Sequence, residues 1–326
     1  VNEQPPPPQQ HHLPPYFLKQ PLLHQTHTHL HPAMPPAVPT PPRGHYYDHI
    51  FIMVFENTPF SIAMKDPHFL SFAKKGTLLT NYHALTHPSH LNYMAMICGT
   101  LELTDTSIID LLEKEHLTWK AYQESYPGDC YIGTTFQTYT RKHNPFISLH
   151  TIQQNPSRCA KIVNATDTYL GLDADLAAGT LPHFSFYTPD IYNSGRNTGV
   201  TYAGNYLHSF FKNRLSYFPD RTLILVTFDE DDRTENNHVY AVLVGSDIDS
   251  GRNLSTHYNH YSILKTIEMN WDLMSLGKGD VSANAFDLGA VTTSSRCYCS
   301  LSFCLFLVLG WSVLVAIALV WAMLMI

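Results

Sequence analysis

Residues 51–57 read Phe51-Ile52-Met53-Val54-Phe55-Glu56-Asn57, an apolar run that ends on a carboxylate and an amide. A second such run, Thr222-Leu223-Ile224-Leu225-Val226-Thr227-Phe228, ends on Asp229-Glu230-Asp231-Asp232. Runs this apolar are typical of strands buried on both faces of a parallel sheet. Ligands collect at the carboxyl ends of such strands. The two stretches therefore predict a set of oxygen-bearing side chains at one edge of a sheet.

Extended and helical patterns alternate along the rest of this region. Strands are expected over residues 49–55, 77–82, 119–122, 183–187, 222–228 and 239–245. Helices are expected over residues 67–75, 91–98, 105–115 (with Thr104 or Asp105 as N-cap), 166–178, 202–212 and 261–269. This alternation predicts an α/β fold, a three-layer α/β/α sandwich with a mostly parallel central sheet.

A serine lies in a turn-like setting between the two apolar runs, in His87-Pro88-Ser89-His90-Leu91-Asn92-Tyr93. Hydrolysis of a phosphate ester needs an activated hydroxyl and neutralisation of the phosphoryl charge, and a divalent cation on hard oxygen ligands supplies both. Three carboxylates and an amide are available as ligands: Glu56, Asn57, Asp229 and Glu230. Ser89 would supply the attacking oxygen. Taken alone, each motif is an ordinary loop or turn, so the prediction depends on their combination.

The charge balance argues against a nucleic-acid partner. The 326-residue chain has a formal net charge of −7, and nucleic-acid binding needs clustered Lys and Arg. The densest basic stretch is Arg141-Lys142-His143, which is too short to follow a phosphate backbone but suits one phosphate group. A small phosphate-ester substrate is therefore expected.

The two ends of the chain differ in composition from its middle. Residues 1–44 are rich in Pro, Gln and His, which predicts a disordered arm, and we expect any signal peptide to have been removed. A catalytic domain is expected over residues 45–288 and a spacer over 289–300. Residues 301–326 are an uncharged apolar run long enough to cross a bilayer. We expect it to be a lipid-anchor signal, with a transmembrane anchor as the alternative, and either places the protein at a membrane surface.

Cysteine and sequon positions fit the secretory route. Cys130 and Cys159 flank a segment that a disulfide could close, whereas Cys98 lies in an expected buried helix. Asn164-Ala165-Thr166 and Asn253-Leu254-Ser255 are candidate glycan acceptors. These features predict an extracellular, cell-surface protein anchored through its C-terminal segment.

Six motifs in order resemble one enzyme family: Phe55-Glu56-Asn57, Thr86 to Tyr93, Arg141 to Pro145, Tyr187-Thr188-Pro189-Asp190, Thr227 to Glu230, and His257 to Ser262. Together they resemble the phosphoesterase family of bacterial phospholipases C and fungal-type acid phosphatases, a branch of the alkaline phosphatase superfamily. Asn270 to Leu273 and Ser275 to Asp280 look closer to the acid phosphatases. The resemblance covers about residues 46 to 288.

The resemblance implies an alkaline-phosphatase-like fold and a role for each matching residue. Glu56, Asn57, Asp229 and Glu230 would bind a divalent metal ion, and Ser89 would form a phosphoseryl intermediate. His143 is the candidate acid for the leaving alkoxide and Lys142 a charge neutraliser. The residues assigned to the substrate site are Asn92, Asp190, Arg196 and His260.

Departures from the family pattern leave alternatives open. Leu91 stands where many relatives carry Pro, and Asn193-Ser194-Gly195-Arg196-Asn197 replaces an Asn-Asp-Gly-His-Asp run, with Arg196 available to grip a phosphate. We expect an acid phosphatase acting on phosphomonoesters. The alternatives are a phospholipase C-like phosphodiesterase and a catalytically silent surface binding protein on the same scaffold.

Overall fold

The computed structural model describes residues 43–102 and 104–289. Nearly all of the arm expected over residues 1–44 lies outside this part, as do residue 103, the spacer from residue 290 on and the apolar run 301–326. Within the described ranges, no helix combines the length and apolar character needed to span a membrane.

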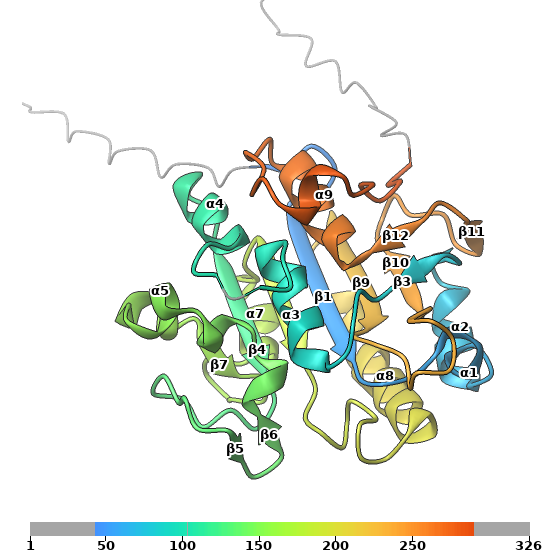
Figure 1. The fold of residues 1–326 in the computed structure, drawn as a ribbon, viewed down its shortest axis with the longest axis horizontal. Helices are drawn as coiled ribbons and strands as arrows, with labels where there is room; N and C mark the ends of the chain where they lie inside the picture. The colour runs from blue at the N-terminus through green and yellow to red at the C-terminus, as the bar shows by residue number, and fades with distance from the viewer. Residues whose placement is uncertain (1–42, 103, 290–326) are drawn as a thin grey trace, which may run out of the picture. The chain divides into compact units, whose positions relative to one another are not determined.

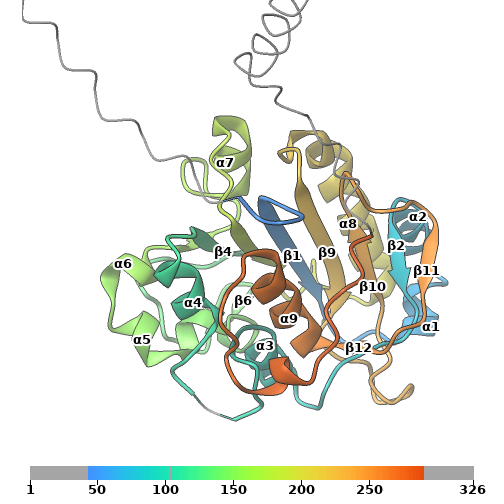
Figure 2. The ribbon, with the colours of Figure 1, turned by 90° about the horizontal axis from the view of Figure 1, so that it is seen from above.

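An eight-stranded sheet forms the centre of the fold, in the order β11-β2-β10-β9-β1-β8-β4-β7 (Figures 1 and 2). Its strands are β1 (His49–Phe55), β2 (Thr77–Leu79), β4 (Trp119–Gln123), β7 (Ile162–Asn164), β8 (Phe184–Thr188), β9 (Thr222–Phe228), β10 (Ala241–Val244) and β11 (Arg252–Leu254). Two small sheets pair β12 (Tyr258–Asn259) with β3 (Tyr82–His83), and β5 (Thr135–Phe136) with β6 (Tyr139–Thr140). In the large sheet β10 pairs antiparallel with both neighbours, and the other pairings are parallel. The predicted mostly parallel sheet is confirmed.

The α-helices are α1 (Phe60–Ala63), α2 (Pro67–Ala73), α3 (Ser89–Cys98), α4 (Ile108–Lys114), α5 (His150–Gln153), α6 (Pro156–Cys159), α7 (Leu172–Ala178), α8 (Val200–Arg214) and α9 (His260–Asn270). Short 3-10 turns are η1 (Arg141–His143), η2 (Phe146–Ser148), η3 (Leu215–Tyr217) and η4 (Gly279–Val281). Helices α3, α4 and α9 lie on one face of the sheet, and α2 and α8 pack together on the other (Figures 1 and 2).

Aromatic contacts show how the two helical layers bury the sheet. Phe51 on β1 contacts Phe210 of α8, whereas Phe186 on β8 contacts Tyr93 of α3. The central strands β1, β8 and β9 are almost entirely buried, as expected for strands covered on both faces. The three-layer α/β/α sandwich is therefore confirmed.

Two helices start three or more residues later than predicted. Helix α4 begins at Ile108 with Ser107 as N-cap, because Ser107 and Asp110 form a reciprocal capping box; Thr104 and Asp105 precede it. Helix α7 begins at Leu172, because the Asp167 carboxylate accepts hydrogen bonds from the backbone N–H groups of Tyr169 and Leu170 in a turn.

The expected disulfide between Cys130 and Cys159 is present, with the two Cα atoms 5.5 Å apart. Cys98 is a buried free thiol in α3. Of the two sequon asparagines, Asn253 is exposed and Asn164 is partly buried.

Candidate active site

The carboxyl ends of β1 and β9 bring two distant segments together. The strands pair in register, with Phe55 opposite Phe228, and the backbone N–H of Asp229 donates to the carbonyl of Phe55 at 3.0 Å. Glu56 and Asp229 therefore leave the same edge of the sheet side by side. The backbone N–H of Asn57 donates to Asp229 Oδ1 at 3.1 Å and closes this junction.

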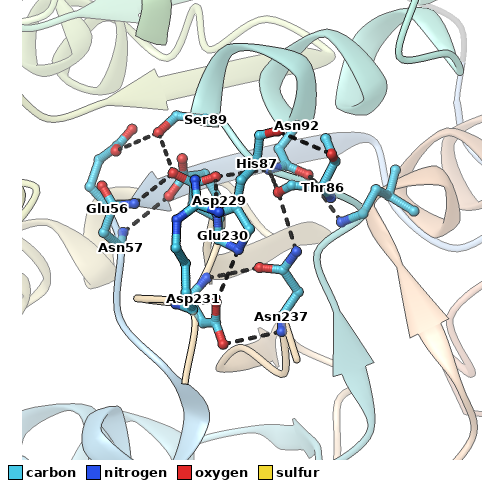
Figure 3. A network of polar contacts seen from close by, with 12 residues as sticks. Glu56, Asn57, Thr86, His87, Ser89, Asn92, Asp229, Glu230, Asp231 and Asn237 are labelled. Atoms are coloured by element: carbon cyan, nitrogen blue, oxygen red, sulfur yellow. Dashed lines mark hydrogen bonds and ion pairs between the residues drawn. The ribbon is translucent and has the colours of Figure 1, made fainter. Parts of the chain in front are cut away.

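Ser89 is the first residue of α3, and its hydroxyl points toward the carboxylates of Glu56 and Glu230 (Figure 3). Ser89 Oγ lies 2.8 Å from Glu230 Oε1 and 3.2 Å from Glu56 Oε2, so either oxygen can accept its proton. The side chain is 2% exposed. The first turn of a ten-residue helix favours an anion at this point through its free N–H groups and its dipole.

Glu56 is wholly buried, and its Oε1 atom contacts side chains of α3 and η1. The Tyr93 hydroxyl donates to Glu56 Oε1 at 2.8 Å. His143 Nε2 lies 3.0 Å from the same oxygen, within ion-pair distance, but their geometry is not that of a hydrogen bond. Burial by itself raises the pKa of Glu56, but His143, Tyr93 and Arg196 outweigh it and hold that pKa below its usual value. Glu56 is thus a buried carboxylate kept in its charged form.

Asn57 and Glu230 complete the cluster around the serine. The Asn57 amide nitrogen donates to Glu230 Oε1 at 2.6 Å, while His87 Nδ1 lies 2.8 Å from Glu230 Oε2. Asn57 has a φ of 49°, in the left-handed region that Asn tolerates better than most residues. This backbone turn lets Glu56 and Asn57 face the same point.

Asp229 carries an unpaired acceptor. Its Oδ2 atom is buried and has no hydrogen-bond partner among the described residues. Burial raises the pKa of Asp229 well above its usual range, and the Glu56 and Glu230 carboxylates raise it further. The four predicted ligands, Glu56, Asn57, Asp229 and Glu230, therefore converge around an acceptor in need of positive charge, and hard oxygen donors of this kind suit a divalent cation.

The described residues include no group of three or more His, Cys, Asp and Glu side chains already arranged to hold a metal ion. Arg196 brings a positive charge into the cluster. Its Nη1 atom lies 3.0 Å from Glu56 Oε2, 2.6 Å from Asn57 Oδ1 and 3.4 Å from Ser89 Oγ. The predicted substrate residue Arg196 therefore does lie in the site, in contact with two predicted metal ligands and the predicted nucleophile.

Lys142 and His143 occupy different environments. Lys142 is partly exposed, and its pKa is lowered by burial and by the charge of Arg196, against the opposing effect of Glu56, Asp229 and Glu230. That position suits charge neutralisation near the serine. His143 is 2% exposed, is stacked against the Tyr93 ring and lies behind Glu56, which favours a role in holding Glu56 over the predicted role as proton donor.

Three predicted substrate residues form hydrogen bonds with protein groups at or near the site. Asn92 Oδ1 accepts from the backbone of Leu85 and Thr86, which fixes the turn before Ser89. Asp190 caps its own loop by accepting from the N–H groups of Tyr192 and Asn193. His260 is buried with Nε2 2.7 Å from the Asp229 carbonyl, and burial lowers its pKa to about 4. Their bonding partners among the described residues are protein groups, and their assignment to substrate contacts stays a prediction.

Sequence reasoning gave no role to three residues that shape the site: His87, Tyr93 and Glu124. His87 bridges Glu230 and Asp231, and Tyr93 bonds Glu56. Both belong to residues 86–93, one of the segments that carry the family resemblance, and both lie close to Ser89 in sequence. This closeness to the predicted nucleophile was the available signal. Glu124 accepts from Tyr187, Tyr206, Asn193 and the N–H of Asp190, and no sequence pattern pointed to it.

Comparisons with known proteins show the family of this chain. A family model described as "Phosphoesterase family" matches residues 63–274. The chain is 34% identical over 275 residues to a probable acid phosphatase of Kluyveromyces lactis, covering 77% of this chain and 64% of that protein. It is also 34% identical over 283 residues to a phosphate-repressible acid phosphatase of Penicillium chrysogenum, covering 80% of this chain and 68% of that protein. The chain thus spans about two thirds of the length of these relatives.

More distant similarities extend in sequence and in structure. A phosphatidylinositol-3-phosphatase of Mycobacterium tuberculosis is 26% identical over 249 residues, covering 71% of this chain and 79% of that protein. A Vibrio parahaemolyticus protein of the alkaline phosphatase superfamily superposes with a TM-score of 0.50 at 16% identity, covering 74% of this chain and 71% of that one. The structural likeness concerns the fold, and it confirms the predicted alkaline-phosphatase-like architecture. By its sequence match, its fold and the residues gathered around Ser89, this chain belongs to the phosphoesterase family.

Proposed function

We propose that this chain is a metal-dependent acid phosphatase that hydrolyses phosphomonoesters through a phosphoserine at Ser89. The observation that carries the proposal is the Ser89 hydroxyl, which starts α3 within 2.8 Å of Glu230 and 3.2 Å of Glu56. Relatives named acid phosphatase, at 34% identity, support the same activity.

The proposed reaction has two displacements at phosphorus. Ser89 Oγ forms a bond to phosphorus as the bond between phosphorus and the ester oxygen breaks, the hydroxyl proton passes to the adjacent carboxylate of Glu230, and the departing alkoxide takes a proton from solvent. Water then attacks the phosphoserine and loses a proton to solvent, the Oγ–P bond breaks, Glu230 returns its proton to Ser89 Oγ, and inorganic phosphate departs. The N–H groups at the start of α3 and the Lys142 ammonium offset the negative charge on the phosphoryl oxygens.

The residues present fit a divalent cation. Glu56, Asn57, Asp229 and Glu230 would hold it, and the buried unpaired Asp229 Oδ2 marks an acceptor that it would satisfy. A cation bound there supplies charge neutralisation and favours the ionised form of a nearby alcohol. In this proposal Tyr93 and His143 keep Glu56 oriented toward Ser89.

The decisive experiment compares Ser89→Ala with Ser185→Ala, a buried serine of β8 outside the site. Turnover of 4-nitrophenyl phosphate at acidic pH is expected to fall by at least about a thousandfold in Ser89→Ala. Ser185→Ala should retain it. Chelation should abolish wild-type activity and added metal restore it. Undiminished turnover in Ser89→Ala, or full activity in excess chelator, contradicts the proposal.

The same assay separates the alternatives. Hydrolysis of phosphatidylcholine in preference to 4-nitrophenyl phosphate identifies a phospholipase C-like phosphodiesterase. No turnover of either substrate in any metal tested identifies a silent scaffold, for which the Arg196 contacts with Glu56 and Ser89 are the motivating observation.

We also propose that the protein is a secreted glycoprotein displayed at a cell surface and held to the membrane through residues 301–326. The Cys130–Cys159 disulfide supports an oxidising compartment, and the exposed Asn253 is an accessible glycan acceptor. Fractionation of tagged protein between membrane and medium, before and after phospholipase treatment, tests both the anchor and its chemistry. Recovery of unglycosylated protein in the cytosol contradicts this location.

A further inference from the structure

One guanidinium nitrogen contacts atoms that would otherwise face a metal ion. Arg196 Nη1 lies 3.0 Å from Glu56 Oε2, 2.6 Å from Asn57 Oδ1 and 3.4 Å from Ser89 Oγ. Two of these oxygens belong to predicted metal ligands and the third to the predicted nucleophile. A cation within reach of all three atoms occupies the side of the cluster from which Glu56 and Asn57 would bind a metal.

The electrostatics of the cluster require a positive charge at this point. Glu56 and Asp229 have no exposed surface and Glu230 has little, and unpaired carboxylates in such a setting are costly. The other basic groups nearby, His87, His143 and Lys142, contact different carboxylate oxygens or lie further out. Arg196 is the group that neutralises the Glu56 oxygen directed toward Ser89.

The loop that carries Arg196 is built to hold it there. The Ser194 carbonyl accepts from the Glu56 N–H at 3.0 Å, and the Ser194 N–H donates to the Asp190 carbonyl at 2.8 Å. Gly195 and Gly199 have φ values of 88° and 84°, which only glycine adopts without strain. The backbone on both sides of Arg196 is therefore fixed, whereas its side chain is 30% exposed to solvent.

We propose that Arg196 is a resident cation of this site: its guanidinium holds Glu56 and Asn57 in the absence of metal, and a divalent ion binds by displacing it. Arg196 thereby sets the affinity of the site for metal, and once displaced it faces the entrance where a phosphate would arrive. This inference rests on the metal site of the proposed function. It concerns this chain's arginine, at the position where the family pattern carries His.

The test measures metal binding and stability and needs no turnover. Arg196→Met removes the charge while keeping much of the side-chain length, and Arg252→Met is the matched control. Arg252, the first residue of the edge strand β11, is 32% exposed and pairs with Asp287. Titration of Mn²⁺ by calorimetry gives the affinity, and thermal melting gives the stability of the metal-free protein.

Arg196→Met is expected to bind Mn²⁺ roughly tenfold or more tightly than the wild type, because binding no longer requires displacement of the guanidinium. Metal-free Arg196→Met should melt at a lower temperature than the wild type, and Mn²⁺ should raise its melting temperature by more. Arg252→Met should match the wild type in affinity and in the melting shift caused by Mn²⁺. Arg196→Lys, which keeps the charge on a shorter side chain, should have an intermediate affinity.

Several results overturn the inference. An Mn²⁺ affinity of Arg196→Met that is equal to or weaker than that of the wild type overturns it. Should Arg196→Met fail to fold, an affinity in Arg196→Lys no tighter than wild type is decisive against it. If neither the wild type nor the variants bind Mn²⁺, the metal site of the proposed function is refuted as well. If the wild type binds Mn²⁺ and Arg196→Met binds it no more tightly, only the role of Arg196 is refuted.

Discussion

Glu56 shows how a buried carboxylate is shared between structure and chemistry. Its Oε1 atom faces inward to Tyr93 and His143, and its Oε2 atom faces Ser89 and Arg196. A charged group with no exposed surface needs this number of partners, because each lost partner leaves part of its desolvation uncompensated. The partners come from α3, η1 and the loop before α8, so the orientation of one side chain depends on three separate segments.

The role of His143 can be separated from that of a proton donor. His143→Gln is expected to lower kcat by roughly ten- to a hundredfold, because Glu56 loses an ion-pair partner. A positioning residue should affect 4-nitrophenyl phosphate and an alkyl phosphate to the same extent, since the loss depends on leaving-group basicity only when the removed residue protonates the leaving group. The measurement is kcat for both substrates in wild type and variant. A loss confined to the alkyl phosphate would restore His143 as the acid.

At the scale of the elements, the sequence predicted the parts of the site that depend on local pattern. Strands β1 and β9 match the expected bounds, because an apolar run of seven residues bounded by polar ones is a strong local signal. Helix α3 was expected from Leu91 and begins at Ser89, so the predicted nucleophile is the first helical residue. Glu56, Asn57, Ser89, Asp229 and Glu230 meet as the prediction required (Figure 3).

The parts of the fold and of the site that the sequence did not predict depend on contacts between distant segments. Asp190 and His260 sit in recognisable motifs, yet they bond to protein backbone, and a motif does not reveal the direction of a side chain. Glu124 fixes the loop of Arg196 through partners 63 to 82 residues away, which no local pattern encodes. Short strands such as β7 and β11 were also missed, since three residues carry too little periodicity.

Helix α9 contains a carboxyl group that couples stability to pH. Burial raises the pKa of Glu268 to about 7, and the nearby Asp280 raises it further, although the Leu276 N–H opposes this effect. The folded state thus binds the proton more tightly than the unfolded state, whose ordinary value is near 4.5. This contribution is complete below about pH 4.5 and is lost as the pH rises through about 7.

Glu268→Gln should therefore match wild-type stability near pH 4.5 and exceed it at pH 7.5. The expected gain is roughly 1 to 2 kcal/mol after allowance for solvent screening. Urea unfolding at the two pH values measures it, with the exposed Glu115→Gln as control. A difference between Glu268→Gln and wild type that does not change with pH would show that Glu268 is ionised throughout.

At the scale of the whole molecule, one covalent bond closes the region between β4 and β7. The Cys130–Cys159 bond links residues 29 positions apart, and a loop of this length removes chain entropy from the unfolded state. The double variant Cys130→Ser/Cys159→Ser is expected to lose roughly 3 to 4 kcal/mol of stability. Thermal melting of oxidised wild type, reduced wild type and the double variant measures this loss. Equal melting temperatures for all three would contradict it.

The alignment of β1 with β9 has a further consequence for the time at which activity arises. Asn57 and Asp229 are 172 residues apart in sequence, and the strand pairing between them places both at one edge. During synthesis Glu56 and Asn57 emerge long before Asp229 and Glu230, so the nascent polypeptide cannot assemble this cluster until β9 has left the ribosome and paired. Formation of the proposed site is thus a late event in the life of the chain, reached only when nearly all of its central sheet is assembled.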